Sequence, residues 1–251
     1  MTDKTRDSLG WRRTFGVLVP STNTSVQPEF DEMRPAGVTN HISRIRIPNM
    51  PLATDADFKR LIGLIAAAQD EAVESVMSCE PDHLVLGISA ETFWNGLQAS
   101  RDLKAHLVKL TGLPISMGSE ASGAALDLFG AKNIAVLTPY HPVGDENVIR
   151  FFGESGYEVK RIKGLRCESP VKIAHVSEKA LASALRELDG DDIDVLVQVG
   201  TNLAMARLAA QAELWLRKPV IAINTAIYWH ALRTSGIEDK VRGFGSLLEQ
   251  H

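Results

Sequence analysis

The chain has 251 residues, of which 45% are apolar and 23% charged, as in an ordinary globular protein with a sizeable core. Its net charge of −4 offers no basic surface for nucleic acid, and no apolar run approaches the ~20 residues that a membrane span needs. Segment 1–13 lacks the apolar stretch of a secretory signal, and two cysteines give no disulfide framework, so we expect a cytoplasmic protein. No Cys/His cluster has metal-ligand spacing.

Strand-like and helix-like segments alternate along the whole chain. Continuously apolar runs such as 84–86 and 195–197 are typical of parallel strands covered on both faces, and segment 58–77 places its apolar residues mostly on one helical face. This alternation predicts α/β layers joined by right-handed crossovers. The expected elements are strand 15–20, helix 24–34, strand 39–47, helix 55–79, strand 82–88, helix 97–111, strand 114–117, helix 119–129, strand 132–138, helix 143–154, strand 157–163, helix 175–188, strand 194–199, helix 202–216, strand 219–223 and helix 225–235.

The two halves of the chain resemble each other. The run VLVP ending at Pro20 is echoed by VLTP ending at Pro139, and DHLVLG ending at Gly87 is echoed by DVLVQVG ending at Gly200. These similar offsets predict two pseudo-symmetric lobes with parallel sheets flanked by helices. Ligands of open parallel sheets bind beyond the carboxyl ends of the strands, so four strand ends should meet at one cleft between the lobes. We expect one lobe to comprise 14–118 plus 220–251 and the other to comprise 119–219.

Segment 16–24, GVLVPSTNT, is the most informative motif. An apolar run stops at a proline, and small polar residues follow before an amphipathic stretch begins. A buried strand would deliver hydroxyl and amide groups, and the free N–H groups of a helix start, to one spot that suits a carboxylate or phosphate. Thr22 and Asn23 can hold one carboxylate there. Helix capping is an alternative role for each such side chain taken singly.

These motifs resemble the aspartate/glutamate racemase superfamily, especially maleate cis-trans isomerases and arylmalonate decarboxylases, from about residue 15 to 245. The first motif is most like that of maleate isomerases, where the matching asparagine contacts a substrate carboxylate. Segment LTGLP at 110–114 is similar to the decarboxylases. The resemblance implies an enzyme without a cofactor that acts on a small carboxylic acid. Its best-matched stretches are VPSTNT at 19–24, GIS at 87–89, LTPY at 137–140 and GTNL at 200–203.

The chain departs from these families at the cysteines. Racemases and maleate isomerases of this kind carry a cysteine at the end of each of two strands, and arylmalonate decarboxylase keeps only the second. Gly87 and Gly200 stand at those positions here, while Cys79 and Cys167 lie elsewhere. Two-base racemization and thiolate addition to a double bond are therefore lost in their usual form, and the thiol that protonates the enediolate in arylmalonate-type decarboxylation is missing too. We expect the glycines to leave free volume and to let backbone N–H groups approach a ligand.

The residues for binding an anion are still present. Ser89, Tyr140, Thr201 and Asn202 are placed to form a second polar site, which would stabilise the charge on a carboxylate when it becomes an enediolate. Glu91, beside aromatic residues that would raise its pKa, is a candidate general acid or base, as are His141 and the weakly acidic Tyr140. A solvated helix cap and an exposed loop are the structural alternatives for Glu91 and His141. The candidate catalytic residues are Glu91, His141 and Tyr140, and the candidate substrate-binding residues are Thr22, Asn23, Gly87, Ile88, Ser89, Tyr140, Gly200, Thr201 and Asn202.

Several functions stay open. The first is a decarboxylase-like lyase or an isomerase in which Glu91 or a water replaces the thiols. The second is a carboxylate-binding protein without catalysis, descended from such an enzyme, and a third is a hydrolase that uses Glu91 and water. A Glu91 that faces the cleft with a perturbed pKa favours an enzyme, and one that faces solvent favours a binding protein. The sequence predicts a small carboxylic acid as partner, no nucleic acid and no membrane, and leaves homo-oligomer formation open.

Overall fold

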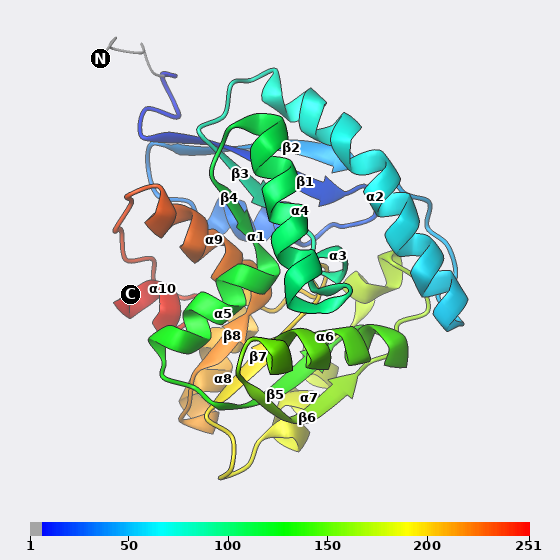
Figure 1. Cartoon of the computed structure of the whole chain (residues 1–251). Helices are drawn as coiled ribbons and strands as arrows, with labels where there is room; N and C mark the ends of the chain where they lie inside the picture. Colours follow the sequence, from blue (N-terminus) through cyan, green and yellow to red (C-terminus); the bar gives the residue numbers. More distant parts are fainter. Residues whose placement is uncertain (1–6) are drawn as a thin grey trace.

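Two four-stranded parallel sheets form the two lobes of the protein (Figure 1). The computed structural model describes residues 7–251; residues 1–6, part of the segment without a predicted signal sequence, lie outside the described residues. The strand orders β2-β1-β3-β4 and β6-β5-β7-β8 are the same in both halves of the chain. The predicted α/β fold with two pseudo-symmetric lobes is therefore confirmed.

The first lobe begins with a strand whose last six residues are all buried, as expected for the apolar run before Pro20. Helix α2 starts at a capping box in which Thr54 and Asp57 bond each other's backbone. Helix α4 ends at Thr111, and the C-cap residue Gly112 has a φ of 69°, which suits glycine. The elements are β1 (Arg13–Pro20), α1 (Val26–Met33), β2 (Val38–Ile45), α2 (Asp55–Met77), β3 (His83–Leu86), α3 (Ala90–Phe93), α4 (Gly96–Thr111), β4 (Ile115–Met117) and α5 (Gly118–Leu128).

The second lobe repeats this plan. Pro142 opens α6, where a missing N–H costs no helical hydrogen bond, and the Ser177 hydroxyl caps α7. Three short helices, α3, η1 and α10, were not predicted because each is only about one turn long. The elements are β5 (Asn133–Thr138), α6 (Pro142–Glu154), β6 (Glu158–Gly164), η1 (Val171–His175), α7 (Glu178–Leu188), β7 (Val195–Gln198), α8 (Ala206–Leu216), β8 (Val220–Ala222), α9 (Ile223–Thr234) and α10 (Ser246–Gln250).

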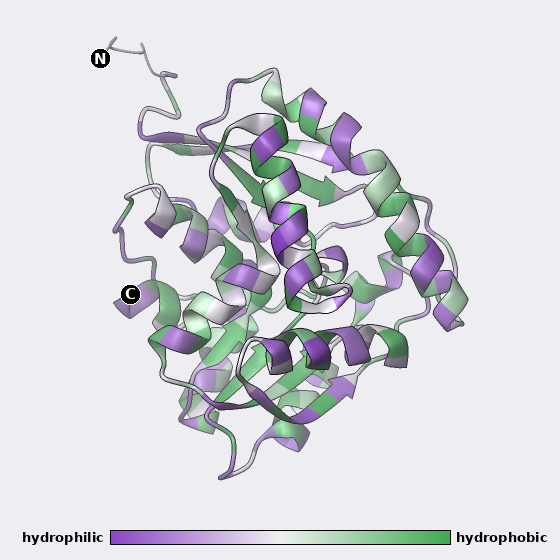
Figure 2. Cartoon of the chain, viewed as in Figure 1, coloured by the Kyte–Doolittle hydropathy of each residue, from purple (hydrophilic) through white to green (hydrophobic). Residues whose placement is uncertain are grey.

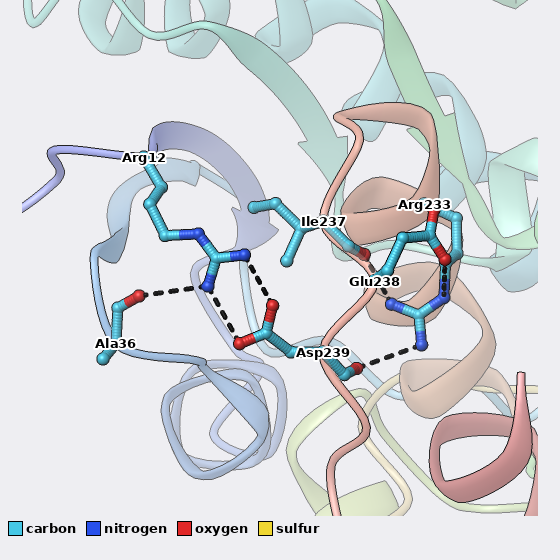
Figure 3. A network of polar contacts seen from close by, with 6 residues as sticks. All are labelled: Arg12, Ala36, Arg233, Ile237, Glu238 and Asp239. Atoms are coloured by element: carbon cyan, nitrogen blue, oxygen red, sulfur yellow. Dashed lines mark hydrogen bonds and ion pairs between the residues drawn. The ribbon is translucent and has the colours of Figure 1, made fainter.

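The C-terminal part of the chain returns to the first lobe, but later than expected. Strand β8 pairs with β7, so residues 220–222 belong to the second sheet and not to the N-terminal lobe. Helix α9 then packs on β3, β4, α1 and α5. Helix α5, which we expected in the second lobe, packs mainly on α9 and β4 and so lies with the first lobe. Figure 3 shows how the following segment is held there: the Arg12 guanidinium binds the Asp239 carboxylate, with Nη1 2.9 Å from Oδ1, and Arg233 Nη1 donates to Ile237 O at 2.6 Å.

One hydrophobic cluster runs through both lobes. It joins Phe15 and Val17 of the first sheet to Val136 and Phe152 of the second lobe, and Tyr228 of α9 packs in the same cluster. Figure 2 shows apolar strands in both sheets and helices with mixed surfaces around them. Because a packed core resists deformation, this shared cluster fixes the relative position of the strand ends. Within residues 7–251, no helix combines the length and the apolar character of a membrane span.

Candidate active site

A cavity of about 60 Å³ lies where the carboxyl ends of β1, β3, β5 and β7 meet. Pro20 at the end of β1 and Ser89, Pro139 and Gly200 just after β3, β5 and β7 line it, so the predicted convergence of the four strand ends on one pocket is confirmed. Gly87, which we expected to contact the substrate, does not line the cavity. This is the position at which parallel sheets bind ligands. The predicted residues that line the cavity are Thr22, Asn23, Ile88, Ser89, Tyr140, His141, Gly200, Thr201 and Asn202.

The hydroxyl groups of Ser89 and Tyr140, hereafter the hydroxyl pair, lie 2.7 Å apart, and both residues are buried. Ser89 Oγ also accepts a hydrogen bond from Thr201 N at 3.2 Å. Whichever hydroxyl donates to the other, one of the two hydroxyl hydrogens stays available to a ligand. Burial raises the pKa of Tyr140 well above its ordinary value, so the phenol is neutral and serves as a hydrogen-bond donor.

Asn23 has the capping role that the sequence left open, and its amide keeps one hydrogen that no described residue uses. Its Oδ1 accepts hydrogen bonds from Ser25 N at 2.9 Å and Val26 N at 3.0 Å, which caps the start of α1. Its Nδ2 donates to Thr201 Oγ1 at 3.2 Å, and Thr201 Oγ1 donates in turn to Gly87 O at 3.2 Å. An amide nitrogen carries two hydrogens, so one of them remains for a ligand. Asn23, Ser89, Tyr140 and Thr201 together form what we call the polar cradle.

Asn202 connects loops of both lobes. Its Oδ1 accepts from Thr24 N at 2.9 Å, and its Nδ2 donates to Pro170 O at 3.0 Å and lies 3.4 Å from Thr22 O. Because backbone groups use its whole amide, Asn202 holds the loop that carries Thr22 in place and has no free hydrogen for a substrate.

Apolar side chains of both lobes also line the cavity, and we call this set the apolar wall. The edge of the Phe58 ring packs on Tyr140, with ring centroids 5.3 Å apart, so the wall also supports the polar cradle. The lobes meet beside it, where Leu52 N donates to Glu168 O at 2.8 Å. Among the described residues that line the cavity, none is acidic and none is a cysteine. The apolar wall consists of Ile47, Leu52, Phe58, Leu61, Ile65 and Ile173.

His141 lines the cavity at the start of α6 and is half-buried. Its Nε2 lies 3.3 Å from Cys167 O. A carbonyl oxygen can only accept, so this contact places a hydrogen on Nε2 and leaves Nδ1 as the acceptor of the neutral ring. His141 and Tyr140 are the two titratable side chains that the described structure places at the cavity.

Glu91 does not line the cavity, contrary to the expectation that it would face the substrate. Helix α3 begins at Ala90, which does line the cavity, and one further helical residue turns the side chain toward α2. The Gln69 amide, with its NH₂ group assigned toward the carboxylate, donates to Glu91 Oε1 at 3.2 Å. Burial and the nearby Asp70, opposed by His106, together raise the pKa of Glu91 to about 7. The pKa of Glu91 is raised as predicted, but the side chain lies between α3 and α2 and not at the cavity.

Glu91→Gln should therefore change stability and leave the cavity intact. The pKa of about 7 in the folded state exceeds the ordinary value of 4.5, so ionised Glu91 weakens the fold as pH rises from about 4.5 to 7. The variant should melt at a higher temperature than the wild type at pH 8 and lose this advantage at pH 4.5. Thermal melts across this range check it, with the exposed Glu74→Gln on α2 as control. A difference that does not vary with pH would contradict the assignment.

The two cysteines lie outside the cavity lining. Cys79 is exposed after α2, and burial raises the pKa of the Cys167 thiol to about 11. The glycines at the strand ends do not leave the free volume that we expected. A Cβ at Gly87 would lie 2.7 Å from Val26 Cγ1, and one at Gly200, where φ is 109°, would lie 2.6 Å from Pro139 Cγ. Backbone and neighbouring side chains have closed in on both positions, which favours glycine there.

Comparisons with known proteins agree with this architecture. A maleate isomerase from Pseudomonas putida is 26% identical in an alignment that covers 93% of this chain and 96% of the relative. A maleate cis-trans isomerase from Nocardia farcinica, solved as a mutant with a covalently bound succinylcysteine intermediate, superimposes with a TM-score of 0.86 at 20% identity, covering 95% and 99% of the two chains. A liganded mutant of arylmalonate decarboxylase superimposes with a TM-score of 0.81 at 21% identity, covering 95% of this chain and 100% of the other. The sequence model described as arylmalonate decarboxylase matches residues 15–248, so the chain belongs to the arylmalonate decarboxylase family.

Proposed function

We propose that the protein is a cofactor-independent enzyme that removes one carboxylate from a small malonate-type acid with an apolar group on its α-carbon. The observation that carries this proposal is the division of one cavity into a polar cradle of neutral donors and an apolar wall. Relatives named maleate isomerase and a family named for arylmalonate decarboxylase support chemistry next to a carboxylate.

In the proposed reaction, one carboxylate is held by the polar cradle and the other lies against the apolar wall. The carboxylate against the apolar wall loses its hydration, which destabilises its charge. Its departure as CO₂ removes this charge from the apolar wall. The bond between the α-carbon and the leaving carboxylate breaks, and its electron pair passes through the α-carbon into the retained carboxylate. The negative charge of the resulting enediolate lies on its oxygens. The free hydrogens of Asn23 and of the hydroxyl pair donate hydrogen bonds to these oxygens and stabilise the charge.

The α-carbon then needs a proton, and His141 is our candidate donor. In its protonated form both ring nitrogens carry hydrogens; Nε2–H is bound to Cys167 O, so Nδ1–H is the hydrogen that can be transferred. A new C–H bond forms, neutral His141 remains, and solvent returns its proton. The reaction consumes one proton and releases one CO₂, with no oxidant or reductant.

Other function classes would need different groups at the cavity. Isomerisation by thiolate addition would need a cysteine, and hydrolysis by Glu91 and water would need Glu91, but the described structure puts neither in the lining. A carboxylate-binding protein without turnover would need only the polar cradle. Decarboxylation is therefore the enzymatic function that the arrangement of side chains supports best, and binding alone is its main competitor.

A substrate series in D₂O tests the proposal. Malonate and malonates with methyl, propyl or phenyl groups on the α-carbon are incubated with the protein, and CO₂ release and the product NMR spectrum are recorded. We expect turnover to increase with the apolar group and the product to carry one new deuterium on its α-carbon. The double variant Cys79→Ser/Cys167→Ser should keep the wild-type rate. Binding without CO₂ release would favour the binding protein, and inactivation by iodoacetamide that substrate prevents would restore a role for a thiol.

A further inference from the structure

The carboxylate of Glu29 lies outside the cavity and is linked to the polar cradle through hydrogen bonds of Asn224. We propose that Glu29 is a positioning residue for the reaction: it holds Asn224 so that Asn224 fixes Thr201 and, through Thr201, the donors of Ser89 and Asn23. This inference rests on the proposed function, because it concerns the same polar cradle. Glu29 itself does not line the cavity, so it acts only through these neighbours.

Glu29 links the two lobes. It lies on α1, the helix that follows the loop carrying Thr22 and Asn23, and its side chain is half-buried. Its Oε1 accepts from Ala206 N at 2.9 Å, at the first residue of α8, whose own N-cap residue provides no side-chain hydrogen bond. Its Oε2 accepts from Asn224 Nδ2 at 2.6 Å. A carboxylate of the first lobe thus caps a helix of the second lobe and holds a side chain of α9.

Asn224 carries this constraint to the polar cradle. Its Nδ2 also donates to Thr201 O at 2.9 Å, and the residue is only 1% exposed. Thr201 in turn donates its N–H to Ser89 Oγ at 3.2 Å and accepts from Asn23 Nδ2 at 3.2 Å. Two hydrogen bonds, from Asn224 to Glu29 and to Thr201, therefore separate the carboxylate from the residue that connects the two ligand-facing donors.

The amide of Asn224 needs the ionised carboxylate to keep its orientation. Both Nδ2 hydrogens have acceptors, Glu29 and Thr201 O, whereas the buried Oδ1 has no partner among the described residues. A protonated Glu29 would carry a hydrogen that this Oδ1 can accept. Turning the amide to satisfy it would take the N–H donor away from Thr201 O. Ionised Glu29 thus keeps Thr201 in place, and protonated Glu29 releases it.

The ionisation of Glu29 changes in an accessible pH range. Its pKa is raised to about 7: burial, the largest cause, and the nearby Glu32 raise it, and hydrogen bonds from Asn224, Ala206 and Met205 lower it. The charged group facing this region from α8 is Arg207, whose Nε binds Glu32 Oε2 at 2.7 Å. We therefore expect the polar cradle to be best ordered above pH 7.

Glu29→Gln tests the proposal, with Glu32→Gln as a matched control on the same helix that leaves the chain of contacts intact. With the best substrate of the malonate series at pH 8, kcat/KM should fall about tenfold or more in Glu29→Gln, because small displacements of catalytic groups are costly. The wild-type limb of the pH profile near 7 should be reduced in Glu29→Gln. In Glu32→Gln it should be kept but lie at a lower pH, because Glu32 no longer raises the pKa of Glu29. A limb that persists unchanged in both variants would come from a group other than Glu29. Asn224→Ala, which keeps the carboxylate but cuts the chain of contacts, should show the same loss at pH 8.

Crystal structures of the wild type and both glutamine variants at pH 8 give a readout that needs no turnover. We expect the Thr201 N to Ser89 Oγ and Asn224 Nδ2 to Thr201 O distances to lengthen in Glu29→Gln and to stay unchanged in Glu32→Gln. Unchanged distances, or a lower melting temperature with unchanged kcat/KM, would overturn the proposal. If the wild type turns over no malonate, the proposed function fails, while the two distances still decide whether Glu29 positions the polar cradle.

Discussion

Removing both members of the hydroxyl pair, in the variant Ser89→Ala/Tyr140→Phe, should lower kcat by about 10²–10³-fold with a smaller change in KM. The charge of the enediolate develops after the substrate binds, so donors aimed at it contribute more to the transition state than to binding. The substitution Tyr140→Phe keeps the aromatic ring, whose centroid lies 5.3 Å from that of Phe58, so the loss should not come from a collapsed wall.

The single variants should lose less than the double variant. In the wild type, one hydroxyl hydrogen is used within the pair and the other is free, so either hydroxyl left alone still has a hydrogen for the ligand. Steady-state kinetics of the two single variants and the double variant measure this coupling. Tyr157→Phe is the control, because the Tyr157 hydroxyl donates to Asp127 Oδ1 at 2.7 Å and does not line the cavity. An unchanged kcat in the double variant would exclude the polar cradle as the enediolate site.

His141→Asn should lower kcat by about 10²–10⁴-fold, the range expected when a general acid is lost. Asparagine retains an amide that can bond Cys167 O but cannot transfer a proton at neutral pH. Single-turnover measurements should show a slowed overall reaction, and added imidazole should restore part of the rate. His175→Asn provides the control, since His175 is exposed on η1 and lies outside the cavity lining. Equal rates for His141→Asn and the wild type would assign protonation to water.

Much of the cavity lining could be predicted because its residues lie in short local motifs. An apolar run that ends in proline or glycine marks a buried parallel strand, and the repeat of two such runs places four strand ends together. These motifs identify Asn23, Ser89, Tyr140 and Thr201 without any knowledge of tertiary contacts. The boundary between the lobes was harder to predict from the sequence. Residues 220–222 form a strand that pairs with β7, and this pairing joins segments that are distant in the sequence.

The sequence by itself determined the α/β class, the repeat and the loops that carry the polar cradle, because hydrophobic periodicity and strand-end motifs are local properties. The tertiary structure decided which way the side chains on these loops point. One helical residue after Ala90 turns Glu91 to Gln69, and nearby atoms occupy the space that a Cβ would need at Gly87 and Gly200. The contact of Glu29 with Asn224 joins residues 195 positions apart, and the packing of two lobes, which no local pattern encodes, brings them together.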